Sequence, residues 1–210
     1  IWKFATKSSL WAQPAFYDGE IYLSAMDHKM YALSIKDGSL LWSADLGSAA
    51  ISNPSIEPGK ALYVGTIGGD LIALDINSGS QLWKHPSDFG IWATPMIKEN
   101  VLYYGDLDGN FIAFDVANKQ PLWQYKAGGS IVSAALLKED RIMFSSENGV
   151  LNIVGYDGKV ILSPAISEKL YGSPVSTNGY TLVGVTTSKD KILSALDENG
   201  NQVWAFQVPK

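Results

Sequence analysis

Short apolar segments separated by turn residues run along the whole chain. Near the N-terminus they cover residues 13–16, 21–24, 30–33 and 40–43, and they are rich in branched and aromatic residues. Such runs are typical of β-strands, and no useful stretch keeps the period of an amphipathic helix. Seven Asn-Gly or Asp-Gly pairs occur in the chain, and these pairs provide the positive φ angles that tight hairpins require. The pattern therefore predicts an all-β fold.

The same pattern returns about every forty residues. One residue type keeps this period at Trp2, Trp42, Trp83, Trp123 and Trp204, with Leu162 at the vacant place. A second type keeps it independently at Pro14, Pro54, Pro95 and Pro174, with Ala135 at the vacant place. Because two residue types share one period, the chain consists of structural repeats.

Four short strands in every repeat predict a β-propeller with five four-stranded antiparallel blades. One blade cannot bury both of its faces, so neighbouring blades must stack. The repeats place the blades at residues 9–46, 49–87, 90–127, 129–166 and 169–208. Residues 1–8 match the last strand of a blade and predict an additional strand of the outer type. Ile1 is not a native start, so we expect either a minimal five-bladed ring or part of a larger propeller.

Each blade ends in a recurring sequence motif, which is clearest in Ala73, Asp75, Gly79 and Trp83. This motif resembles the repeat of the PQQ-like (pyrroloquinoline-quinone-like) propeller family. The resemblance implies that each tryptophan docks between adjacent blades, where a neighbouring backbone group can accept its indole N–H. It also implies an extracytoplasmic location, periplasmic or at the cell surface. The fourth blade departs from the repeat, since it lacks both the proline and the tryptophan.

Composition narrows the classes of function. The chain has 210 residues with 46% hydrophobic residues and a formal net charge of −5. It can bury a large core, and it has neither a basic patch for nucleic acid nor an apolar run that predicts a membrane span. Cysteine is absent, which excludes disulfides, thiolate metal sites and cysteine nucleophiles. No catalytic motif is present, so we expect no enzyme activity, no cofactor and no bound metal.

Two tryptophans lie outside the repeat position. Trp11 and Trp92 both stand three residues before the proline of their blade, and Tyr171 holds the matching place in the fifth blade. In a propeller these positions surround the mouth of the central channel. The three aromatic side chains are therefore candidates for binding a peptide, a sugar ring or an apolar side chain. The alternative is that they plug the channel or pack beneath loops.

Other polar residues carry weaker predictions. Carboxylates recur in the second turn of each blade, at Asp27, Asp70, Asp106, Asp108, Glu147 and Asp190. They could attract a cation or a basic partner, but aspartate beside glycine or lysine is ordinary turn chemistry, which is the interpretation we favour. The two histidines, His28 and His85, stand in different blades, so we expect no shared metal site.

These observations favour a non-enzymatic scaffold that binds another protein through its loop face. The chain also looks similar to the propeller lipoprotein of the outer-membrane barrel assembly machine, which holds partners by its loops. A small-ligand, carbohydrate-binding or sensor module is an alternative. A fragment of a PQQ-dependent dehydrogenase is less favoured. The resemblance implies that those enzymes are far longer than this chain and usually carry an adjacent cysteine pair over the cofactor. The oligomeric state stays open.

Overall fold

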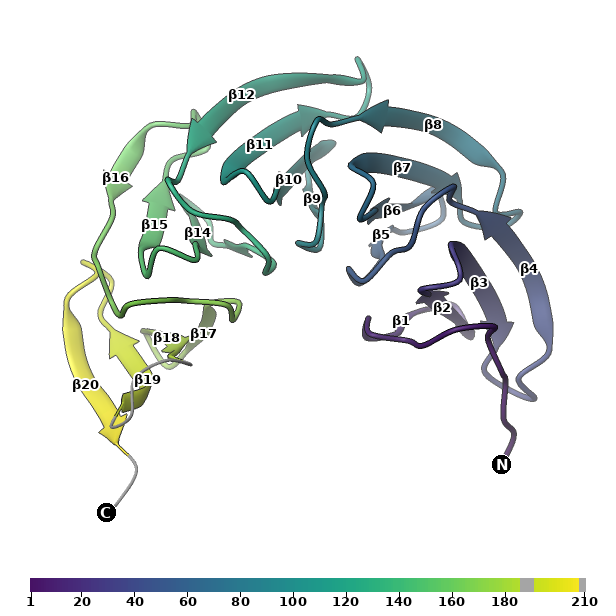
Figure 1. The fold of residues 1–210 in the computed structure, drawn as a ribbon, viewed down its shortest axis with the longest axis horizontal. Helices are drawn as coiled ribbons and strands as arrows, with labels where there is room; N and C mark the ends of the chain where they lie inside the picture. The colour runs from purple at the N-terminus through teal and green to yellow at the C-terminus, as the bar shows by residue number, and fades with distance from the viewer. Residues whose placement is uncertain (186–190, 208–210) are drawn as a thin grey trace. The chain divides into compact units, whose positions relative to one another are not determined.

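The computed structural model describes residues 1–185 and 191–207, and its strands form five four-stranded antiparallel sheets (Figure 1). No helix occurs among these described residues. The predicted all-β propeller fold is thereby confirmed. The chain divides into two compact units, Ile1–Glu99 and Asn100–Lys210, and each unit is described by itself.

The strands follow one another with short turns between them. The first sheet contains β1 (Ala15–Tyr17), β2 (Glu20–Ser24), β3 (Lys29–Ser34) and β4 (Leu40–Asp45). The second contains β5 (Ser55–Glu57), β6 (Ala61–Gly65), β7 (Asp70–Asp75) and β8 (Gln81–Pro86). The third contains β9 (Met96–Lys98), β10 (Val101–Gly105), β11 (Asn110–Asp115) and β12 (Gln120–Lys126). The fourth contains β13 (Leu136–Leu137), β14 (Ile142–Ser145), β15 (Leu151–Val154) and β16 (Val160–Leu162). The fifth contains β17 (Val175–Thr177), β18 (Tyr180–Gly184), β19 (Lys191–Leu196) and β20 (Gln202–Gln207).

Every sheet is a meander in which strands adjacent in sequence are hydrogen-bonded neighbours. The third and fourth strands share one register: Ala32 faces Trp42, and Ala73 faces Trp83. A register shift follows each alanine directly. Because alanine is small, the bulky indole opposite it can lie across the sheet. This pairing explains why alanine recurs with tryptophan in the sequence.

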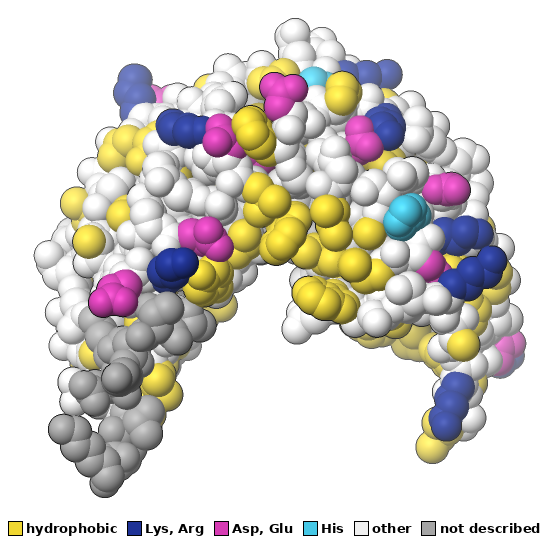
Figure 2. Space-filling view, viewed as in Figure 1, with side chains coloured by type: hydrophobic (Ala, Val, Ile, Leu, Met, Phe, Trp, Pro, Cys, Tyr) yellow, Lys and Arg dark blue, Asp and Glu magenta, His cyan; other side chains and the backbone are white. Residues whose placement is uncertain are grey.

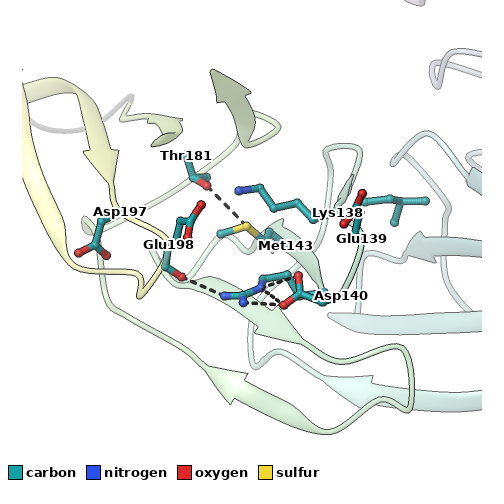
Figure 3. A pocket seen from close by; sticks show the side chains of 9 residues that line it. Lys138, Glu139, Asp140, Met143, Thr181, Asp197 and Glu198 are labelled. Carbon is teal, nitrogen blue, oxygen red and sulfur yellow. Dashed lines mark hydrogen bonds and ion pairs between the residues drawn. The ribbon is translucent and has the colours of Figure 1, made fainter. Parts of the chain in front are cut away.

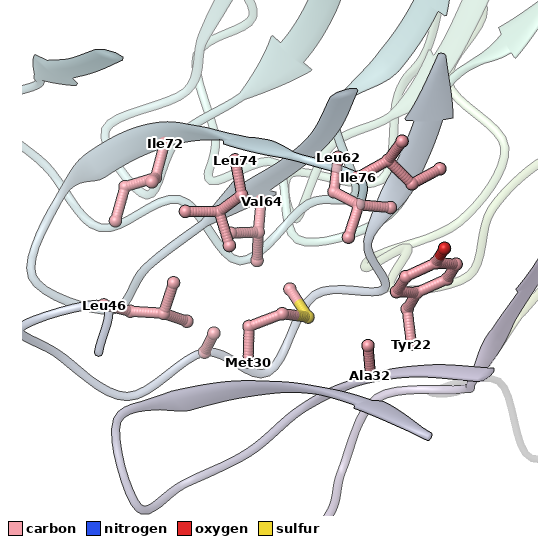
Figure 4. Packing of buried hydrophobic residues seen from close by; sticks show 10 residues of the cluster. Tyr22, Met30, Ala32, Leu46, Leu62, Val64, Ile72, Leu74 and Ile76 are labelled. Atoms are coloured by element: carbon pink, nitrogen blue, oxygen red, sulfur yellow. The ribbon is translucent and has the colours of Figure 1, made fainter. Parts of the chain in front are cut away.

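The second and third strands of each sheet form the core. In unit 1, the buried cluster of β2, β3, β6 and β7 includes Tyr22, Met30, Leu62 and Ile72 (Figure 4). In unit 2, Met143, Leu151 and Val183 belong to a corresponding cluster. In the second sheet, β6 and β7 are buried along both faces, as expected for stacked blades, whereas β18 of the fifth sheet is buried only at alternate residues.

Trp42 and Trp123 contact the neighbouring repeat in the same way. The Nε1 of Trp42 donates to the Ile76 carbonyl at 3.2 Å, and a Cβ added at Gly79 would lie 2.4 Å from the Trp42 ring. Trp123 donates to the Tyr156 carbonyl at 2.9 Å and covers Gly158. Because glycine has no side chain, the indole ring can pack directly on its backbone, and we call this position the glycine seat. These contacts match the docking role that the family resemblance implied.

The N-terminal segment uses the same contact without forming the additional strand expected for residues 1–8. The first strand of the structure begins at Ala15. Trp2 nevertheless donates from Nε1 to the Ile35 carbonyl at 3.0 Å and covers Gly38. Phe4 packs edge-on against Tyr31 with ring centroids 5.5 Å apart. A strand would need backbone hydrogen bonds along its length. This segment is held instead by the contacts of its side chains.

Trp204 differs from the other repeat tryptophans. It lies on β20 with 42% of its surface exposed. The expectation that it packs as a buried docking residue is therefore not met within the described residues.

Candidate functional site

The connections that lead into β1, β5 and β9 carry exposed aromatic side chains. Trp11 leaves 71% of its surface exposed and Trp92 leaves 36%. Ile51, at the matching position, is half-buried. Figure 2 shows hydrophobic side chains gathered on this face where the three connections lie. We call this surface of unit 1, formed by residues 9–13, 49–53 and 90–94, the loop face.

Backbone hydrogen bonds fix the loop face to the adjacent turns. Met26 donates its N–H to the Ser9 carbonyl at 3.1 Å, and Ile91 donates to the Thr66 carbonyl at 2.9 Å. Ile91 is fully buried beside Gly65, where an added Cβ would lie 2.3 Å from the isoleucine side chain. Trp92 thus follows directly after an anchored residue. A ligand that contacts this face meets a preorganised backbone, which lowers the entropy lost on binding.

A polar ladder joins the same three connections at the residue before each proline. Gln13 donates its backbone N–H to Oδ1 of Asn53 at 2.7 Å, and Asn53 donates its own N–H to Oγ1 of Thr94 at 3.2 Å. These residues are not among the predicted site residues. A signal was available, because Gln13, Asn53, Thr94 and Ser173 all carry a side-chain oxygen one residue before a repeat proline.

The third predicted site residue, Tyr171, belongs to unit 2. It lies in the connection that precedes β17 and exposes 37% of its surface. Trp11, Trp92 and Tyr171 therefore share one position in the repeat and are all accessible to solvent. Their joint role as a binding site stays a prediction.

The turn carboxylates are held by local partners. Asp27 accepts hydrogen bonds from the Tyr31 hydroxyl at 2.6 Å and from the Lys7 backbone at 2.9 Å. Burial alone would raise the pKa of Asp27, but these hydrogen bonds outweigh burial and lower its pKa. Asp70 pairs with Lys84 at 2.7 Å, and Asp106 accepts backbone N–H groups within its own turn. These contacts favour the turn-chemistry interpretation.

No group of three or more histidine or carboxylate side chains that could hold a metal ion occurs in residues 1–185 and 191–207. Asp190, the last of the predicted carboxylates, lies outside the described residues. The imidazole of His85 has a lowered pKa because its partial burial disfavours the charged form.

Glu57, the last residue of β5, belongs to a structural cluster at the end of its sheet opposite the loop face. It accepts from Lys60 Nζ at 2.7 Å and from the Tyr63 hydroxyl at 2.6 Å. Burial would raise the pKa of Glu57, but the two hydrogen bonds together hold it below its usual value. Burial of Tyr63 itself, together with its hydrogen bond to Glu57, raises the pKa of the Tyr63 hydroxyl.

A second candidate site lies in unit 2. A cleft of about 470 Å³ opens between the β13–β14 turn and the β19–β20 turn (Figure 3). Lys138, Arg141, Met143, Thr181 and Glu198 are among its lining residues. None of the predicted site residues lies in this cleft. Its signal was the coincidence of the chain's single arginine with the blade that lacks the repeat tryptophan.

The repeat geometry and the five meander sheets define a propeller of the PQQ-like class. The family model described as outer membrane protein assembly factor BamB matches residues 1–153, and the chain belongs to this family. BamB from Moraxella catarrhalis has a similar fold, with a TM-score of 0.81 and 20% identity over 96% of this chain and 66% of that chain. No helix in the described residues is long and apolar enough to span a membrane.

Quinone enzymes share the fold. Quinohemoprotein alcohol dehydrogenase from Comamonas testosteroni has a TM-score of 0.79 and 15% identity over 96% of this chain and 43% of that chain. Quinohemoprotein alcohol dehydrogenase ADH IIB of Pseudomonas putida is 35% identical over 82 residues, which are 34% of this chain and 12% of that protein. The chain therefore spans a minor part of the length of these enzymes.

Proposed function

We propose that this chain is a non-enzymatic, protein-binding scaffold whose partner docks on the loop face. The observation that carries the proposal is the 71% exposure of Trp11 on a backbone that hydrogen bonds hold in place. An indole in water is unfavourable, and interfaces are enriched in tryptophan for that reason. Trp11 and Trp92 serve as the aromatic anchors, and Tyr171 presents the same kind of group from the fifth sheet.

The proposed partner is another protein, and the proposed location is extracytoplasmic. Membership of a family described as an outer membrane protein assembly factor supports both. The polar ladder supports a docking role as well, because it keeps three successive connections in register. A partner strand or loop that crosses them would contact apolar rings beside a line of polar groups, which is the composition of a specific interface.

Site-specific photo-cross-linking tests this proposal. A photoreactive phenylalanine analogue at Trp11 or Trp92 is expected to give one discrete protein adduct in the cell of origin. The same analogue at Trp204, an exposed tryptophan on β20, is the matched control and is expected to give none. The purified adduct partner then supplies the binding assay.

In that assay, Trp11→Ala is expected to weaken binding at least roughly 30-fold, since truncating an aromatic anchor costs about 2 kcal/mol or more. Trp92→Ala is expected to act in the same direction with a smaller effect, because less of its surface is exposed. Trp11→Ala should unfold near the wild-type urea concentration, and Trp92→Ala should unfold at a somewhat lower one because most of its side chain is covered. Unchanged affinity in both would remove the loop face from the proposal.

The second candidate function is part of a quinone-dependent dehydrogenase, which the matches to alcohol dehydrogenases favour. Against this candidate, the chain has no cysteine and so cannot supply the adjacent cysteine pair that the resemblance implies for these enzymes. The test is thermal unfolding with added PQQ and calcium. The scaffold proposal expects no shift of the midpoint, and a saturable rise would replace it with the enzyme.

Carbohydrate or small-ligand binding at the loop face is the remaining alternative, because exposed indoles also stack on sugar rings. Titration with a glycan panel, followed by tryptophan fluorescence, separates the two possibilities. A saturable change that Trp11→Ala abolishes would favour the carbohydrate, whereas the scaffold proposal expects a flat titration.

A further inference from the structure

The fourth and fifth sheets meet without the aromatic pair found at other junctions. The Trp42 ring packs against Tyr22 with centroids 6.0 Å apart, and the Trp123 ring packs against Tyr103 at 6.2 Å. In each sheet, the tyrosine and the tryptophan face the same alanine of the third strand. The corresponding pair in the fourth sheet is Met143 and Leu162, which both face Ile153.

The glycine seat remains although the tryptophan is missing. A Cβ at Gly200 would lie 2.4 Å from Leu162, as close as the Cβ at Gly79 would lie to the Trp42 ring. The carbonyl acceptor also remains. Glu198 holds the position whose backbone oxygen accepts an indole N–H at the other junctions, and here it accepts Nη1 of Arg141 at 2.9 Å. Arg141 thus replaces the missing indole donor.

The arginine is held in a fixed plane. Asp140 accepts its Nε at 3.0 Å and its Nη2 at 2.6 Å, and these hydrogen bonds raise the pKa of the guanidinium group further. Arg141 is the single arginine of the chain. A planar guanidinium that is bonded at its edges keeps its faces available for stacking.

Two clefts flank the Arg141–Glu198 contact. The cleft of about 470 Å³ reaches Met143 and Thr181, on the side where the other sheets have a tyrosine (Figure 3). The cleft of about 290 Å³ reaches Leu162 and Ile161, on the side of the missing indole. Substituting smaller side chains for both members of the pair therefore leaves ring-sized spaces that the rest of the fold still accommodates.

We propose that the larger cleft binds an aromatic side chain presented by a polypeptide partner, preferably within a basic segment. Met143 is only 3% exposed and lines the inner end of the cleft, and both its thioether and the guanidinium of Arg141 are groups that favour aromatic rings. Four carboxylates and two basic side chains line the cleft, so positive charges beside the ring are attracted to its rim. The cleft lies at the end of the sheets opposite the connection that contains Tyr171, so it does not depend on the loop face.

The first test uses the full chain with its methionine methyl groups labelled with ¹³C. N-acetyl-tryptophanamide is the probe, and N-acetyl-leucinamide is the control ligand. We expect the tryptophan probe to shift the Met143 methyl resonance in a saturable manner with a millimolar Kd. The leucine probe should leave that resonance in place. Equal shifts from both probes would overturn the proposal.

Variants then separate ring binding from a general effect. Met143→Tyr introduces the tyrosine that the other sheets have at this position. It is expected to abolish binding of the tryptophan probe, measured by NMR as saturation transfer from the protein to the probe. Arg141→Lys keeps the charge but removes the planar face, and it is expected to weaken binding 5-fold or more. Leu41→Trp, which adds an indole to an exposed position of β4, is the control and should bind like the wild type. Wild-type binding by both Met143→Tyr and Arg141→Lys would contradict the site, and Arg141→Lys alone decides if the tyrosine variant does not fold.

A comparison of basic and acidic peptides tests whether the bound ring belongs to a basic segment. Blocked Lys-Trp-Lys is expected to bind at least 5-fold more tightly than blocked Glu-Trp-Glu at low salt, and the difference should shrink at high salt. Equal affinity of the two peptides would reject the basic segment as the occupant. Loss of this binding would leave the loop-face experiments unaffected, so the two proposals fail separately.

Discussion

The contact of Trp42 with the next sheet allows a quantitative prediction. Trp42→Leu reproduces at one junction the residue that the fourth sheet naturally has at Leu162. The substitution removes the hydrogen bond from Nε1 to the Ile76 carbonyl, the ring contact with Tyr22 and the cover over Gly79. Unlike the fourth sheet, the first has no arginine to donate to the vacated carbonyl.

The expected cost follows from these three losses. A carbonyl left without its donor costs about 1–3 kcal/mol, and an aromatic pair contributes about 0.5–1.5 kcal/mol beyond its buried area. The remaining leucine fills part of the space, so a cavity adds less than for truncation to alanine. We therefore expect Trp42→Leu to lower the free energy of unfolding by about 2–4 kcal/mol.

Urea denaturation followed by far-ultraviolet circular dichroism measures this change without relying on the removed fluorophore. The matched control is Trp204→Leu, the same substitution at a side chain with 42% of its surface exposed. It is expected to cost less than about 1 kcal/mol. If both variants shift the midpoint equally at constant m-value, the indole contact with the neighbouring sheet is not what stabilises the fold.

Three further predictions concern other contacts. Gly79→Ala places a Cβ 2.4 Å from an indole ring at φ +70° and should cost at least about 2 kcal/mol more in urea denaturation than Gly19→Ala, which has the same backbone strain and open space. Because the folded pKa of Glu57 is depressed, its contribution to stability is present above the unfolded value of about 4.3 and is lost as pH falls through the folded pKa. The urea midpoint of Glu57→Gln should therefore fall less steeply than the urea midpoint of the wild type as pH is lowered below about 5. Arg141→Met should lower thermal stability by about 0.5–1.5 kcal/mol, because water can replace the guanidinium group at the exposed Glu198 carbonyl. Lys159→Met, which breaks an exposed ion pair, should lower it less.

The fold was accessible from the sequence because its determinants are local and repeated. The repeat length can be read directly from the positions of Trp42 and Trp83. The turn at Gly38 could be predicted because its hairpin needs a positive φ angle. The contact of each indole with a neighbouring repeat could also be expected, since a buried indole N–H must find an acceptor. The particular carbonyl, such as that of Ile76, required coordinates.

The candidate sites were only partly accessible. Trp11 and Trp92 could be selected because they stand outside the repeat, but their exposure depends on how the connections pack. The polar ladder escaped notice because Gln13, Asn53 and Thr94 differ in residue type and share only an oxygen. The cleft at Arg141 requires knowledge that a side chain from one turn replaces an indole from another strand, and no local pattern contains both.

The pairing of each indole with a glycine in the following repeat has a consequence for grafting repeats between proteins. A sheet that is transplanted whole brings its tryptophan but leaves behind the glycine on which that tryptophan rests. A segment that starts at the fourth strand of one sheet and stops before the fourth strand of the next keeps both halves together, as Trp2 and Gly38 do. Chimeras cut at these positions should keep each tryptophan together with its glycine. Chimeras cut between sheets separate the two, so the donor tryptophan must fit a glycine of the host.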